Sequence, residues 1–339
     1  MDIPVDTRLD ADDLGEVAGR ARELAEMGFD GAFTFEGPHD VFVPLILAAG
    51  SGADLDLMTN VAIAFPRSPV HLAHQAYDLQ LLSKGRFRLG LGSQVRAHIE
   101  KRYGSQFARP VARMREVVQA THAVLRCWET GEQLDFRGEF TTHTLMPPTF
   151  NPGPNPFGVP RILVGGLGPK MVAMAAEVAD GLLIHPFNTD RFVHDHTLPA
   201  VDVGLAAAGR SRADIEVVAE LIMACGRDDE EQARADEGAR WLLSFYASTP
   251  AYRPVLDAHG YGDLQPELNR LTKEGRWEAM PALIDDTLLD TIAVRGTPAQ
   301  VGAGIAARCA GVADRVGFYF PYRVDPSCAG EILDALRAA

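Results

Sequence analysis

Basic residues are scarce in this sequence of 339 residues. Lysine and arginine together number 32 against 46 aspartates and glutamates, which gives a formal net charge of −14. Nucleic acids and anionic membranes need a basic face on the protein that binds them. The charge balance therefore argues against both kinds of partner, and we expect a small-molecule substrate.

Cysteine is also sparse, and the four cysteines lie far apart in the sequence. None of them forms a C-x-x-C pair, so neither a zinc knot nor a redox dithiol is indicated. The histidine pair His194 and His196 lacks a convergent set of carboxylates. We therefore predict no metal site and expect the cysteines to be reduced, as is typical of the cytoplasm.

Long apolar runs and several functional motifs are missing too. No stretch of about 18 uncharged apolar residues occurs, which argues against a membrane-spanning helix. The acidic start MDIPVDTRLDADDLGE does not resemble a signal peptide, and no G-x-S-x-G elbow supports hydrolase chemistry. We expect a soluble, cytoplasmic protein.

What the sequence does contain is a regular alternation of apolar strands and amphipathic helices. Strands are predicted over 3–5, 31–36, 56–65, 86–91, 162–164, 181–185, 216–224 and 316–320. Helices are predicted over 12–27, 42–49, 70–83, 111–128, 169–179, 191–209, 229–243, 297–309 and 326–336. About eight strands without a Gly/Ser-rich linker favour an α/β fold of one (β/α)8 barrel over a doubly wound sheet.

Two segments interrupt this alternation. Residues 133–160 read as a hairpin around Arg137-Gly138 followed by a proline-rich loop, and residues 245–290 are mixed. We take 1–339 as a single domain with insertions near 133–160 and 245–290. We expect the loop 146–160 and the second insertion to shape the substrate pocket.

Glycines gather where two of the predicted strands end. Gly90-Leu91-Gly92-Ser93-Gln94 would let a flat cofactor approach the backbone, so Gly92, Ser93 and Gln94 are candidate contacts. Gly165-Gly166-Leu167-Gly168-Pro169 ends a strand and begins a helix, whose free N–H groups and dipole favour a phosphate. The alternative for the second patch is a plain tight turn. Neither patch has the context of a dinucleotide fingerprint, which argues against NAD.

Four titratable residues lie where strands end and are candidates for moving a proton. Glu36 could bind a cofactor ring or transfer a proton, or instead form an ion pair in the barrel mouth. His39 and His98 follow the second and fourth strands, and His185 ends the sixth. A purely structural histidine is the alternative for His185.

Three segments carry a family resemblance. RSPVHLAHQAYDLQLLSKGRFRLGLGSQVRAH (Arg67–His98), GGLGPKMVAMAAEVADGLLIHPF (Gly165–Phe187) and VRGTPAQV (Val294–Val301) resemble the luciferase-like monooxygenase superfamily. Within it they are most similar to the branch of oxidoreductases that depend on the deazaflavin coenzyme F420. The resemblance implies a (β/α)8 barrel that binds a flavin-like ring at the carboxyl ends of its strands.

The resemblance also implies roles for individual residues. Ser93 and Gln94 match cofactor contacts, and Gly165, Gly166, Leu167 and Gly168 match the loop on the phosphate side. Ile184 and His185 match the strand end beside the ring. A cis peptide bond behind the ring is expected around Ala62, Ile63 and Ala64.

One departure from the family limits the assignment. Sugar-phosphate dehydrogenases of this branch carry Asp-His after strand two and Glu after strand four, where this chain has Glu36-Gly37 and Val95. We therefore do not assign that substrate. The first hypothesis is hydride transfer between coenzyme F420 and a small organic substrate. The alternatives are an FMN-dependent monooxygenase and a non-catalytic flavin-binding protein, and for each we expect a homodimer.

Overall fold

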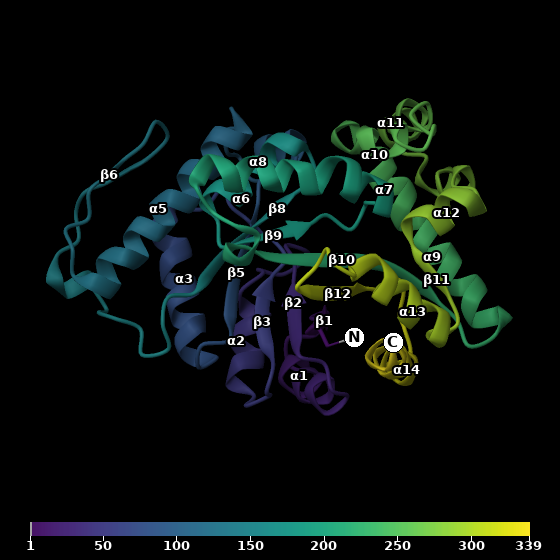
Figure 1. The fold of residues 1–339 in the computed structure, drawn as a ribbon, viewed down its shortest axis with the longest axis horizontal. Coiled ribbons are helices and arrows are strands. Elements are labelled where there is room, and N and C mark those ends of the chain that lie inside the picture. The colour runs from purple at the N-terminus through teal and green to yellow at the C-terminus, as the bar shows by residue number, and fades with distance from the viewer. Residues whose placement is uncertain (1) are drawn as a thin grey trace.

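A parallel barrel forms the centre of the computed structural model, which describes residues 2–339 (Figure 1). Eight of its strands, each hydrogen-bonded to the next, close into a ring. In order they are β1 (Val5–Arg8), β2 (Gly31–Thr34), β3 (Asp56–Thr59), β5 (Phe87–Gly92), β8 (Arg161–Gly166), β9 (Gly181–Ile184), β10 (Glu216–Cys225) and β12 (Arg315–Tyr319). The predicted (β/α)8 barrel is confirmed.

Helices surround the barrel (Figure 1). The longer ones are α1 (Val17–Glu26), α2 (Val43–Gly50), α3 (Pro69–Leu82), α5 (Pro110–Thr130), α6 (Pro169–Val178), α8 (Leu198–Ala208), α9 (Asp229–Ala247), α13 (Pro298–Cys309) and α14 (Pro326–Ala338). All of these except α9 bury apolar residues in the main core of the barrel. Among residues 2–339 we find no helix with the length and apolar character that crossing a membrane requires.

The barrel interior is built in layers because alternate residues of each strand point inward. Strand β10 supplies one side chain to each layer: Glu216, Val218 and Glu220. Glu216 belongs to an ionic layer at the amino ends of the strands, where Arg88 Nε lies 3.0 Å from its carboxylate. Val218 packs in an apolar layer with Phe33, Met58, Leu163 and Leu183. Glu220 lies at the opposite end, where the strands finish.

Several predicted boundaries are wrong in their details. Helix α1 begins at Val17 and not at residue 12, because the Asp13 carboxylate accepts a hydrogen bond from Gly15 N at 2.7 Å and stabilises a turn. The first strand is Val5–Arg8, and the helix predicted over 191–209 is α7 (Asp190–Phe192), a π-helical turn and α8.

The first insertion contains the predicted hairpin, β6 (Phe136–Arg137) and β7 (Thr142–His143), which extends away from the barrel (Figure 1). The proline-rich loop that follows does not shape the mouth, so that expectation is wrong. Its Phe157 carbonyl accepts a hydrogen bond from Gln80 Nε2 at 3.3 Å, near the end of α3. The loop precedes β8, and segments that precede a barrel strand lie at the amino ends of the strands.

The second insertion lies at the other end of the barrel. It contains α10 (Arg253–Asp257), α11 (Leu264–Lys273) and the start of α12 (Asp286–Ile292), which leads into the short strand β11 (Val294–Gly296). These helices share a second apolar core with α9 and with Leu167, Phe187 and Phe192. Because those three residues follow β8 and β9, the insertion lies at the mouth, and its expected part in shaping the substrate pocket stays a prediction.

Candidate active site at the barrel mouth

The strand predicted over 56–65 is interrupted at the mouth. Strand β3 ends at Thr59, a cis peptide bond joins Asn60 to Val61, and β4 (Ala62–Ile63) then pairs with the end of β5. The cis bond lies in the expected segment, but it precedes Ala62–Ala64 and does not fall within it. The side chains of Ala62, Ile63 and Ala64 are fully buried. A bound ring would therefore meet the backbone of this segment.

The glycines at the ends of β5 and β8 make room for Val61. A Cβ atom on Gly92 would lie 2.4 Å from Val61 Cγ2, and one on Gly165 would lie 3.3 Å from Val61 Cγ1. The half-buried Val61 side chain thus fits over both positions. The two glycines have a packing role here, and their predicted contact with a cofactor stays a prediction.

Glu36 forms a half-buried ion pair with Arg67. The two guanidinium nitrogens of Arg67 donate to the two carboxylate oxygens of Glu36 at 2.8 and 2.9 Å, and Ile63 N donates to the same carboxylate at 3.2 Å. Asp40 accepts a further hydrogen bond from Arg67 at 3.2 Å. This arrangement ties the β2–α2 loop to β4. Glu36 is better placed to orient this segment than to release a proton.

His185 is a neutral side chain between two tyrosines. Its Nδ1 accepts a hydrogen bond from Phe187 N at 3.1 Å, and its ring lies 4.5 Å from the Tyr252 ring and 5.1 Å from the Tyr246 ring, centroid to centroid. Burial lowers the pKa of His185 from 6.5 to about 4. Because Nδ1 is an acceptor, the proton of the neutral ring is on Nε2, which is a hydrogen-bond donor.

Glu220 and Asn60 meet inside the mouth. Asn60 Nδ2 donates to the Glu220 carboxylate at 3.1 Å. Burial raises the pKa of Glu220 from 4.5 to about 8, although the hydrogen bond from Asn60 and the charge of Arg8 act in the opposite direction. At neutral pH this carboxyl is therefore largely protonated and can donate a proton as well as accept one.

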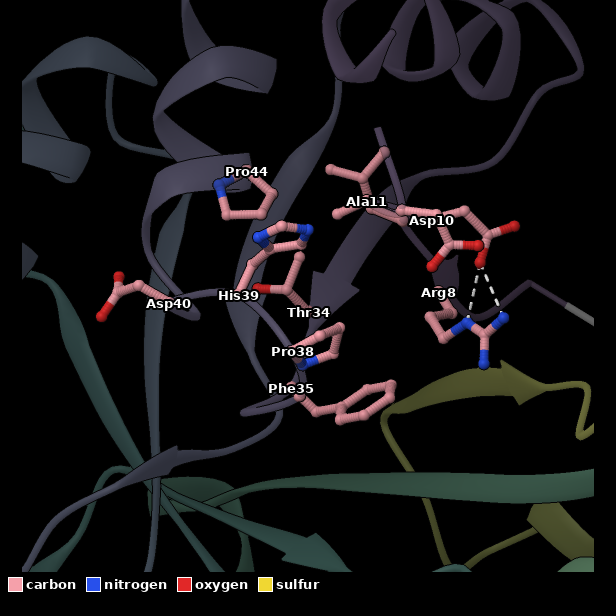
Figure 2. A pocket seen from close by; sticks show the side chains of 12 residues that line it. Arg8, Asp10, Ala11, Thr34, Phe35, Pro38, His39, Asp40 and Pro44 are labelled. Carbon is pink, nitrogen blue, oxygen red and sulfur yellow. Dashed lines mark hydrogen bonds and ion pairs between the residues drawn. The ribbon is translucent and has the colours of Figure 1, made fainter. Parts of the chain in front are cut away.

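His39 lines a pocket of about 110 Å³ beside the ends of β1 and β2. Figure 2 shows its imidazole ring near Pro44 and Thr34, with the Arg8–Asp10 ion pair at the other side of the pocket. The Asp40 carboxylate points away from these residues, toward its partner Arg67.

Ser93, Gln94 and His98 lie on the segment that leaves β5. Gln94 has a left-handed backbone with a φ of 53°, and its side-chain oxygen accepts a hydrogen bond from Val95 N at 2.8 Å. Ser93 and Gln94 are half-buried at the mouth. His98 lies in the short helix α4 (Arg96–Lys101) and is also half-buried.

The loop between β8 and α6 has the properties expected of an anion site. Gly168 caps α6, and no heavy atom lies within 4 Å of the position that a Cβ on it would take. Lys170, in the first turn of α6, is exposed and adds a positive charge to that of the helix dipole. Leu167 is buried in the second core, and Gly166 packs against Val172.

Some of the residues above were not among the sequence candidates. Glu220 could have been found, because it is a charged residue at an inward position of an otherwise apolar strand. Arg67, Asn60, Tyr246 and Tyr252 offered no such signal, since their roles depend on contacts between distant segments. Ile184 is buried in the main core, so only its backbone faces the mouth. Among residues 2–339 no group of three or more His, Cys, Asp or Glu side chains is arranged to hold a metal ion.

Known proteins similar to this chain include an uncharacterised protein of Mycobacterium tuberculosis, 48% identical over 303 residues and 89% of each chain. A provisionally assigned coenzyme F420-dependent oxidoreductase of the same species is 31% identical, over 80% of this chain and 81% of the relative. The structure of the F420-dependent tetrahydromethanopterin reductase of Methanopyrus kandleri aligns with a TM-score of 0.81 at 20% identity, covering 98% of this chain and 97% of the other. The family model described as luciferase-like monooxygenase matches residues 2–315, and the chain belongs to this family.

Proposed function

We propose that this protein is an oxidoreductase that transfers a hydride between coenzyme F420 and a small organic substrate at the barrel mouth. The observation that carries the proposal is the open Gly168 loop between β8 and α6, because β8 pairs with β9 and the neutral His185 directly follows β9. A phosphate-bearing cofactor with a flat ring fits this combination. The similarity to a relative named as F420-dependent supports the choice of deazaflavin.

The residues that would hold the cofactor fall into two groups. Gly168 and Lys170 would bind its phosphate through backbone N–H groups and charge. Val61, packed over Gly92 and Gly165, would support the ring together with the backbone of Ala62 and Ile63. A bound deazaflavin supplies the carbon that gives or takes the hydride, so the redox chemistry belongs to the cofactor.

The protein's own residues orient the reactants and limit water access. His185 Nε2 can donate a hydrogen bond to an oxygen or nitrogen atom in the mouth. The Glu36–Arg67 ion pair fixes the position of β4, against which the ring would lie. The helices of the second insertion, with Tyr246 and Tyr252, shield one side of the mouth from solvent.

A second candidate function uses reduced FMN and oxygen. The family to which the chain belongs is described by monooxygenase activity, and both cofactors have a tricyclic ring and a phosphate. A third candidate is a flavin-binding protein without catalysis. The neutral carboxyl of Glu220 and the neutral His185 favour a catalytic site, because perturbed pKa values gather where protons are moved.

A reaction assay separates these candidates. The purified protein is mixed with F420 and a panel of small alcohols, or with reduced F420 and small carbonyl and conjugated alkene compounds, while the deazaflavin absorbance is followed. In parallel, oxygen uptake is measured with reduced FMN. We expect substrate-dependent change of the deazaflavin spectrum without oxygen. Rapid substrate-linked oxygen uptake with FMN alone would contradict the proposal.

A further inference from the structure

Two carboxylates on β10 point into the barrel, and they have opposite surroundings. The Glu216 carboxylate, at the amino ends of the strands, accepts hydrogen bonds from Arg88 Nε at 3.0 Å and Arg161 Nη1 at 2.9 Å. Glu220, at the mouth, is hydrogen-bonded to the neutral amide of Asn60 at 3.1 Å. A buried carboxyl with a neutral partner is costly to ionise, which sets Glu220 apart from the structural carboxylates below it.

The contact between Glu220 and Asn60 crosses the lumen. Strands β3 and β10 are the third and seventh around the barrel, so they face each other across it. Asn60 directly follows β3, and its backbone N–H donates to the Thr34 carbonyl at 2.7 Å. Asn60, Val61 and Tyr319 are partly exposed, whereas Glu220 is only 8% exposed. The carboxyl therefore lies just beneath the open surface of the mouth.

The titratable groups that face Glu220 come from three elements. Arg8 at the end of β1 favours the carboxylate, but its guanidinium is bound to Asp10 at 2.7 Å. Tyr319 on β12 and Tyr246 on α9 both keep their protons, because burial raises the pKa of each. Burial therefore outweighs the single nearby cation, and Glu220 can change its protonation state near neutral pH.

We propose that Glu220 exchanges the proton that accompanies hydride transfer at this site. The proposal rests on the proposed function. In the reducing direction, the substrate carbon takes a hydride with its electron pair from reduced deazaflavin, and its double bond to a heteroatom opens. The heteroatom takes the proton of the Glu220 carboxyl, which is left as a carboxylate and regains a proton from water. In the oxidising direction each transfer is reversed.

Direct titration tests the first requirement of this proposal. Glu220→Gln is compared with the wild type in protein labelled with ¹³C at the glutamate side-chain carboxyl. The difference spectrum isolates the Glu220 carboxyl, and we expect it to titrate near pH 8. A midpoint near the ordinary glutamate value of 4.5 would overturn the proposal.

Thermal unfolding gives a second readout that does not depend on activity. Between pH 4.5 and about 8 the Glu220 carboxyl is protonated in the folded wild type and ionised in the unfolded chain. Because the folded state binds the extra proton, the free energy of unfolding falls as the pH rises through this range. The melting temperature of Glu220→Gln should therefore rise relative to wild type from pH 5 to pH 8. The control is Glu177→Gln, which breaks the Arg115–Glu177 ion pair on the outer helices and should show a constant difference over this range. A constant difference for Glu220→Gln as well would overturn the proposal.

Turnover completes the test. With a substrate that the wild type converts, Glu220→Gln should lower kcat by about 10²- to 10⁴-fold, the usual contribution of a general acid or base. Its affinity for F420, measured by fluorescence quenching, should change less than about threefold. Suppose that the wild type binds F420 and that the kcat of Glu220→Gln is within tenfold of the wild-type kcat. This result would overturn the role of Glu220 but not the proposed function. Failure of the wild type to bind F420 would overturn the proposed function and this proposal together.

Discussion

At the scale of single residues, the two ends of the barrel differ in the partners of their buried titratable side chains. At the amino ends of the strands the buried carboxylates have cationic partners, as where Arg315 binds both Asp6 and Asp56, although burial still raises the pKa of Asp6 to about 6. The mouth instead keeps Glu220 protonated and His185 neutral through burial. A carboxyl that can give a proton and an imidazole that can donate a hydrogen bond would serve the proposed hydride transfer.

The ion pair between Arg67 and Glu36 gives a prediction about the stability of the protein. Replacing Arg67 with Met leaves the Glu36 carboxylate without its bidentate partner in a site where the two side chains are 15% and 10% exposed. Loss of one partner of a buried ion pair costs about 3–5 kcal/mol. Since this pair is only half-buried, we expect Arg67→Met to lower the free energy of unfolding by about 2–3 kcal/mol in urea denaturation.

The control for this prediction is Arg96→Met. Arg96 forms an exposed ion pair with Glu100, four residues later in α4, and pairs of this kind contribute less than about 1 kcal/mol. Equal losses of stability in the two variants would show that the Glu36–Arg67 pair has no special role.

At the scale of elements, the glycine that ends β5 and the glycine in the β8–α6 loop differ in the space around them. Gly92 must lack a side chain because Val61 occupies that space, whereas Gly168 faces open space and has a φ of −69° that any residue can adopt. We expect Gly92→Ala to lower the free energy of unfolding by about 1–3 kcal/mol through overpacking. Gly168→Ala should leave stability within about 0.5 kcal/mol of wild type.

The Gly168→Ala variant also tests where the cofactor phosphate binds. Gly168→Ala should weaken F420 binding while leaving stability intact, because its methyl group would obstruct the approach of the phosphate to the start of α6. Chemical denaturation and fluorescence titration measure the two effects. A Gly168→Ala variant with wild-type affinity would indicate that the phosphate lies elsewhere.

The elements themselves could largely be predicted from the sequence. The eight strands and the surrounding helices follow from apolar periodicity, and the alternation in EVVAELIMAC places Glu216, Val218 and Glu220 on one face of β10. The exact place of the cis bond could not be predicted, because it depends on how β4 fits beside β5. The position of the proline-rich loop was missed because its composition does not show at which end of the barrel it lies.

At the scale of the whole molecule, the site combines segments that are far apart in the sequence. Glu36 and Arg67 come from the first quarter of the chain, His185 from the middle and Glu220 from the second half, and only the closed barrel brings them to one mouth. Glu36 and His185 could be predicted as site residues from their side-chain chemistry and their positions at strand ends. Arg67, Asn60 and the tyrosines of the insertion required the fold.

Two features of the whole chain stay predictions. The first is that residues 1–339 form a single domain. The second is the homodimer, which is supported by large apolar side chains exposed on the outer helices, such as Ile46 on α2 and Leu82 on α3. A second copy that covered such side chains would remove their apolar area from water.

The most direct test of the account is a fluorescence titration of the purified wild-type protein with oxidised F420, run in parallel with a titration with FMN. We predict saturable quenching of F420 at one molecule per chain, with FMN binding at least about tenfold more weakly, which corresponds to about 1.4 kcal/mol. Tight, saturable binding of FMN without measurable binding of F420 would contradict the assignment of the mouth to a deazaflavin.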